Sequence, residues 1–144
     1  MLTLKFKEAL MEIVKREKGE VIFTGSISLI LQGALKRKPA DIDCFTKTRY
    51  YGNPECTKLN HQSSNKFWDS EGKLIEVVKG ITDNGVPVDY MYREDMPATV
   101  LYILHLNGKK IELKLATVES IHSIKRDYIK RGGTVEKHSD DLPF

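Results

Sequence analysis

Two short stretches decide the fold of this chain: Val21-Ile22-Phe23-Thr24-Gly25-Ser26, and, after a basic turn, Asp41-Ile42-Asp43. The first is an apolar run that ends in a glycine-serine turn, and the second sets two aspartates one residue apart in another apolar run. Successive side chains of a β-strand point to opposite faces of the sheet. We therefore predict that Asp41 and Asp43 share one face while Ile42 enters a core.

The aspartate pair has a chemical consequence. Two carboxylates a few ångströms apart repel each other, so bringing them together is costly unless a cation lies between them. Sites built only from oxygen ligands favour Mg²⁺ or Mn²⁺. The pattern predicts a metal site at Asp41 and Asp43, and the alternative is a solvated strand face after Pro39.

The glycine-serine turn has two interpretations. Gly25 can relieve crowding at a plain strand-to-helix corner, where Ser26 would act as the N-cap. Alternatively, the free N–H groups at the start of the helix would form an anion site for the phosphates of a nucleotide, with the Ser26 hydroxyl as a further donor.

Taken together, the strand, the glycine-serine turn, the helix, the basic turn and the Asp-x-Asp strand over residues 20–46 resemble the nucleotidyltransferase superfamily, which has the polymerase-beta-like fold. The resemblance implies an α/β (α+β) fold with a short mixed sheet covered by helices, in one domain over residues 1–144. It implies transfer of a nucleoside monophosphate from a nucleoside triphosphate to an acceptor. Asp41 and Asp43 would hold Mg²⁺ or Mn²⁺, and Gly25 and Ser26 would hold the phosphates.

Members of this superfamily carry a third acid on a later strand. Asp89 is the best match, because it interrupts a strand pattern in which Val88 and Tyr90 point the other way. Glu112 is the rival, but it alternates with lysines as a solvated hairpin face does. We expect Asp89 to complete the metal and catalytic site.

The C-terminal region has a looser resemblance. Lys125 and the segment over residues 137–142 are similar to the ending of minimal stand-alone nucleotidyltransferases of the abortive-infection type. This implies that Lys125 binds the nucleotide by neutralising phosphate charge. The alternative is a basic, solvated helix face followed by a frayed tail.

The acceptor stays open, with RNA, protein and small molecules as candidates. A second class of function also stays open: a non-catalytic module of the same fold that binds a nucleotide or RNA, or that pairs with a partner protein in a toxin–antitoxin system. Metal-dependent nucleotide binding without turnover would favour that class.

The remaining periodicity completes the predicted fold. Strands are expected over residues 21–23, 40–46 and 86–92, and Asn107-Gly108 predicts a hairpin between residues 100–106 and 109–115. Helices are expected around residues 6–14, over residues 27–35, and after a cap at Thr117. Residues 74–81 fit a helix or a short strand, and residues 47–72 are expected to form a long loop with one helical turn at most.

Composition sets the outer limits. The chain has 144 residues, a net charge of +3 and two cysteines that form no C-x-x-C pair. No apolar stretch reaches the ~18 residues of a membrane span, and the first residues lack the apolar run of a secretion signal. We expect a cytoplasmic protein with reduced thiols and no membrane partner.

Overall fold

The computed structural model describes residues 2–69 and 71–130. Its elements in chain order are α1 (Leu4–Arg16), β1 (Val21–Thr24), α2 (Gly25–Leu31), β2 (Ile42–Thr46), the 3₁₀ helix η1 (Pro54–Leu59), β3 (Ser63–Trp68), β4 (Leu74–Ile81), β5 (Pro87–Arg93), β6 (Thr99–Leu106), β7 (Lys109–Ala116) and α3 (Val118–Lys130).

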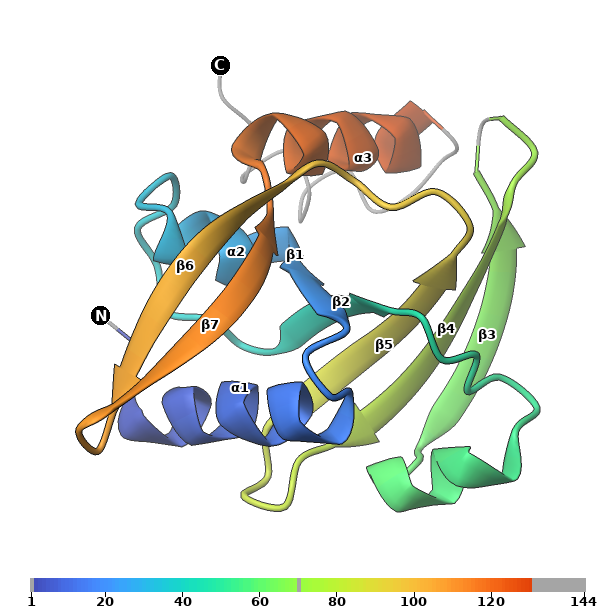
Figure 1. Cartoon of the computed structure of the whole chain (residues 1–144). Coiled ribbons are helices and arrows are strands. Elements are labelled where there is room, and N and C mark those ends of the chain that lie inside the picture. The colour runs from blue at the N-terminus through green and yellow to red at the C-terminus, as the bar shows by residue number, and fades with distance from the viewer. Residues whose placement is uncertain (1, 70, 131–144) are drawn as a thin grey trace.

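The strands form one seven-stranded sheet in the order β3-β4-β5-β2-β1-β7-β6 (Figure 1). The pairs β1–β7 and β2–β5 are parallel, and the other four neighbouring pairs are antiparallel. The predicted α/β fold with a mixed, helix-covered sheet is therefore confirmed. The sheet is larger than the sequence suggested, because β3 was not expected.

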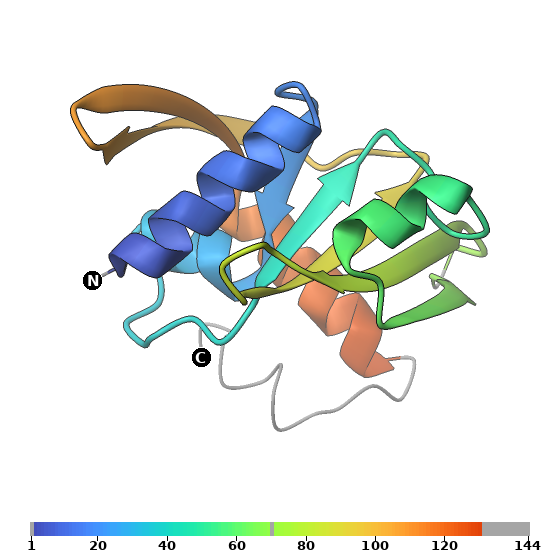
Figure 2. The ribbon, with the colours of Figure 1, turned by 90° about the horizontal axis from the view of Figure 1, so that it is seen from below.

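Helices cover both faces of the sheet. Helix α1 lies on one side and α3 on the other (Figures 1 and 2). The larger core forms on the α1 side, where Leu10 and Ile13 of α1 meet Phe23, Cys44 and Tyr90 of three central strands. A smaller cluster joins Leu29 of α2, Ala116 of β7 and Ile121 of α3.

The alternation of side chains along β2 and β5 decides which of their residues face away from α1. Phe23, Cys44 and Tyr90 are buried in the larger core, so their neighbours Asp43 and Asp89 point to the opposite face. The apolar and acidic residues of β2 and β5 thus separate onto two faces, as predicted for residues 40–46 and 86–92.

Several local predictions are confirmed. Asn107 and Gly108 both have positive φ, at 51° and 76°, as the turn of the predicted hairpin requires. Thr117 caps α3, because its Oγ1 accepts a hydrogen bond of 3.1 Å from the backbone N–H of Ser120. Residues 74–81 are strand β4 rather than a helix. Residues 132–133, two glycines of the kind that end a helix, lie outside the described residues.

Two local predictions are wrong. Ser26 is not the N-cap of α2: the cap is Thr24, which makes no side-chain capping hydrogen bond, and the helix begins at Gly25 and ends at Leu31. Residues 47–72 are not a loop with a single helical turn: η1 agrees with the predicted turn, but the segment also contains the strand β3. The residues of β3 are mostly exposed and carry no apolar alternation, so only the pairing with β4 makes them a strand.

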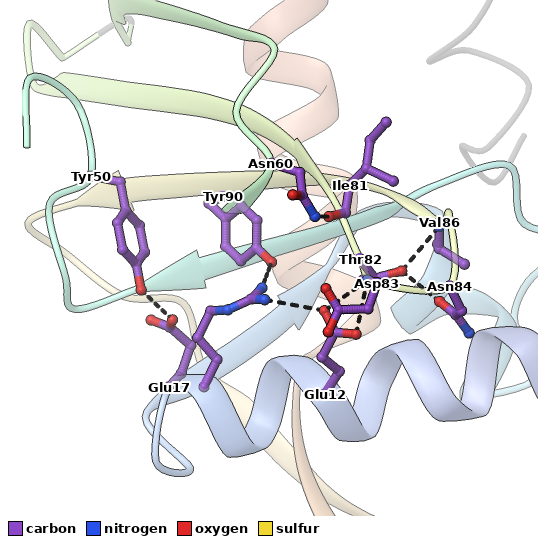
Figure 3. A network of polar contacts seen from close by, with 11 residues as sticks. Glu12, Glu17, Tyr50, Asn60, Ile81, Thr82, Asp83, Asn84, Val86 and Tyr90 are labelled. Atoms are coloured by element: carbon purple, nitrogen blue, oxygen red, sulfur yellow. Dashed lines mark hydrogen bonds and ion pairs between the residues drawn. The ribbon is translucent and has the colours of Figure 1, made fainter. Parts of the chain in front are cut away.

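A polar network ties the end of α1 to the sheet (Figure 3). The Tyr90 hydroxyl accepts a 2.6 Å hydrogen bond from Arg16, and Glu12 accepts one of 3.0 Å from the backbone N–H of Asp83, in the turn between β4 and β5. The Tyr50 hydroxyl donates to the buried carboxylate of Glu17. The contacts of Tyr90 and Asp83 fix β5, the strand that carries Asp89, and the turn before it against α1.

The buried Glu17 predicts a pH-dependent stability. Burial raises the pKa of Glu17, opposed by the hydrogen bond from Tyr50 and by the charge of Arg16. A carboxyl whose pKa is raised by folding stabilises the protein most below its unfolded pKa, and this contribution is lost as pH rises through the folded value. The side chain at this position in Glu17→Gln stays neutral at every pH. The melting temperature of this variant minus that of wild type should therefore increase from about pH 4 to about pH 7.

The matched control for this prediction is Glu20→Gln, which removes a charge from an exposed side chain. Thermal melts of the three proteins across that pH range provide the measurement. A difference between Glu17→Gln and wild type that stays flat, or that shrinks as pH rises, would contradict the prediction.

Candidate metal centre

Three carboxylates converge on the sheet face away from α1. Asp41 lies just before β2, Asp43 lies in β2 and Asp89 in β5, and one oxygen from each lies within 4.8 Å of the other two. We call these residues the acidic cluster. The parallel β2–β5 pair builds it, because its register places Asp43 directly beside Asp89. All three side chains are partly buried.

The glycine-serine turn lies against this cluster. Thr24, the last residue of β1, pairs with Asp43, and Gly25 follows with φ +63°. A Cβ atom added at Gly25 would overlap the Asp43 carboxylate. Glycine is therefore required twice at this position, for the backbone conformation and for the close approach.

Ser26 is more buried than its predicted role as a hydrogen-bond donor to phosphate requires. The whole residue is only 7% exposed and lies in the first turn of a seven-residue helix. Ser26 directly follows Gly25, whose backbone lies against the Asp43 carboxylate. Any contact with a ligand would have to use the small exposed part of this residue.

A lysine that the sequence did not reveal completes the site. The β4–β5 register pairs Lys79 with Asp89, and Lys79 Nζ lies 3.2 and 3.4 Å from the two carboxylate oxygens. Lys79, Asp89, Asp43 and Thr24 thus form one row across β4, β5, β2 and β1. Burial lowers the pKa of Lys79, but the charges of the three aspartates outweigh it, so the net shift is upward.

Cys44 does not join the cluster as a thiolate ligand. It is fully buried in the core on the other face of β2. Burial first, and then the charges of Glu17, Asp43 and Asp89, raise the pKa of its thiol, so it stays protonated at neutral pH. The donor set at the cluster consists of carboxylate oxygens.

The other residues singled out in the sequence are not carboxylates of the acidic cluster. Glu112 is exposed on β7 and is not among the converging carboxylates of the described residues. Lys125 is 8% exposed and belongs to α3, which packs on α2. The segment over residues 137–142 lies outside the described residues.

The acidic cluster fits a hard divalent cation. Mg²⁺ binds oxygen at about 2.0–2.1 Å, so two oxygens on one ion are at most ~4.2 Å apart. The carboxylate oxygens of the acidic cluster lie within 4.8 Å of one another, which is close to that value. Small side-chain rotations would close the difference. Three carboxylates could equally bridge two ions about 3.5–4 Å apart.

Comparisons with known proteins add little to this picture. No protein-family model matches the chain, and no curated protein matches it. Among solved structures, the chain is similar to JHP933 from Helicobacter pylori, with 19% identity and a TM-score of 0.41. The match covers 87% of this chain and 57% of JHP933, so the chain spans little more than half of that protein. A likeness this distant carries no argument about function.

Among residues 2–69 and 71–130, no helix has the length and apolar character needed to cross a bilayer.

Proposed function

We propose that the protein transfers a nucleoside monophosphate from a nucleoside triphosphate to an acceptor, with Mg²⁺ or Mn²⁺ as cofactor. One observation carries the proposal: Asp41, Asp43 and Asp89 converge beside the Gly25 turn. Asp41 and Asp43 share one segment, whereas Asp89 and the Gly25 turn come from other parts of the chain and are brought beside them by the strand pairing. Like charges held close together repel one another, and a divalent cation between them would relieve that repulsion.

Each residue has a role in the proposed reaction. Asp41 and Asp43 would hold the metal, which when bound supplies positive charge at the reacting phosphate. The turn at Gly25 and Ser26 would hold the β- and γ-phosphates, and Lys125 would neutralise part of their charge. Asp89 would orient the acceptor and take its proton. The acceptor oxygen bonds to the α-phosphorus, the bond from that phosphorus to the bridging oxygen breaks, and pyrophosphate leaves.

The direct test uses nucleotides labelled on the α-phosphate, with Mg²⁺ or Mn²⁺ and with RNA, protein and small-molecule acceptors in parallel. We expect label on one acceptor class together with released pyrophosphate. Asp89→Asn should reduce transfer by roughly 10²-fold or more, because a general base typically contributes 10²–10⁴-fold. Glu112→Gln, which neutralises an exposed carboxylate outside the cluster, should keep wild-type transfer. Equal loss in both variants would contradict the role of Asp89.

A second candidate function has a specific observation in its favour. The ion pair between Lys79 and Asp89 already neutralises one carboxylate without a metal, which suits a protein that binds nucleotide or RNA without catalysis, or a component of a toxin–antitoxin pair. Calorimetry with ATP and Mn²⁺ separates the two functions. Binding without turnover on any acceptor would favour the non-catalytic one. Both cysteines are free, as suits a cytoplasmic protein of either kind.

A further inference from the structure

The row of side chains across the sheet has a cation at one end. Lys79 on β4 stands beside Asp89, and Asp43 follows on β2. The Nζ atom contacts both oxygens of Asp89, so this single lysine engages the whole carboxylate. A metal ion bound by Asp89 would need at least one of those oxygens.

The exposed fractions show which partner can move. The Lys79 side chain is 57% exposed and that of Asp89 is 24% exposed. Lysine has a long flexible stem and keeps its charge in water at little cost. Lys79 can therefore swing into solvent, whereas the more buried Asp89 is held by its place between β4 and β2.

We propose that Lys79 is a built-in counter-cation that competes with divalent metal for Asp89. This inference rests on the proposed function. Asp41 and Asp43 then form the position that a metal fills first, and Asp89 contributes only after Lys79 has left it. Lys79 balances part of the cluster's charge while no metal is bound, and it weakens the binding of metal at Asp89.

Mn²⁺ binding to the whole chain tests this competition by calorimetry and by the electron paramagnetic resonance of the free ion. Lys79→Met removes the charge but keeps most of the side chain. We expect it to bind Mn²⁺ about tenfold more tightly than wild type, since it loses both an ion pair and a repulsive charge. Lys79→Arg keeps the charge and should bind no more tightly than wild type.

Lys110→Met is the matched control. Lys110 is also an exposed strand lysine, but it lies on β7, which is separated from β5 by β2 and β1. Its removal changes the net charge equally and should leave Mn²⁺ affinity near the wild-type value. If Lys110→Met also binds Mn²⁺ about tenfold more tightly, the effect is due to net charge alone, and the proposed role of Lys79 is wrong.

Stability without metal provides a second readout. In a chelating buffer, Lys79→Met should melt at a lower temperature than wild type, because Asp89 loses its ion pair and the acidic cluster loses the positive charge of Lys79. Saturating Mn²⁺ should remove or reverse that difference. Adding Asp89→Asn to Lys79→Met should recover the loss in chelator, whereas a loss that persists in the double variant would mark Lys79 as merely structural.

The remaining outcomes separate the inference from the proposed function. If wild type binds Mn²⁺ and Lys79→Met binds it with equal or lower affinity, Lys79 does not compete with metal for Asp89. The proposal that the acidic cluster binds metal would still be supported. If none of the variants binds Mn²⁺, both the proposed function and the competition are wrong.

Discussion

Gly25→Ala is expected to damage both the stability and the metal site of this protein. The substitution forces an alanine into φ +63° and drives its Cβ into the Asp43 carboxylate. The left-handed conformation alone costs a non-glycine residue about 1–2 kcal/mol, and overpacking adds roughly 1–3 kcal/mol. We expect the melting temperature to fall by about 5–15 °C and Mn²⁺ affinity to fall at least tenfold as Asp43 is displaced.

Gly33→Ala separates these two costs. Gly33 has φ +76°, but no atom lies within 4 Å of the position where its Cβ would be. It should therefore show only the conformational cost, about 1–2 kcal/mol, and should keep wild-type Mn²⁺ affinity. Thermal melts and calorimetry on the two variants give the comparison. Equal effects would mean that the contact between Gly25 and Asp43 has no role at the site.

Asp43→Asn is expected to abolish metal binding while the protein stays folded. The amide keeps the volume of the carboxylate but loses its charge, and Asp43 both belongs to the acidic cluster and lies against the Gly25 turn. Changes to groups that merely support metal ligands typically cost 10–100-fold in affinity. We therefore expect loss of a central ligand to cost about 10²-fold or more.

The measurement is the rise in melting temperature with added Mn²⁺. A ligand at about 100 times its Kd stabilises a folded protein by about 2.7 kcal/mol, which corresponds to several degrees for a chain of this size. Wild type and Glu112→Gln should both show this rise, and Asp43→Asn should not. A full rise in Asp43→Asn would remove the acidic cluster from the proposed function.

Local rules account for the parts of the fold that the sequence predicted. The period of two in residues 40–46 placed both aspartates on one face, and Asn107-Gly108 marked the hairpin. Each of these features depends on neighbours only a few residues away. The preference for Asp89 over Glu112 used the same kind of evidence, and the structure places Asp89, not Glu112, beside the pair.

Features set by distant contacts could not be predicted in this way. Strand β3 is polar and mostly exposed, so its existence depends on hydrogen bonds to β4 rather than on its own pattern. The contact between Lys79 and Asp89 depends on the register of two strands, and residues 74–81 fitted a helix equally well. The positive φ of Gly25, at the corner between β1 and α2, is likewise a feature that a sequence does not display.

The parallel pairing of β2 with β5 also determines when a metal ion can act during folding. The two strands are joined through residues 47–86, and closing so long a loop is a slow, entropically costly step. Before that step Asp89 is far from Asp41 and Asp43, so the cation has no high-affinity site on the unfolded chain and cannot nucleate the sheet. A divalent cation should therefore slow unfolding and leave the refolding rate almost unchanged.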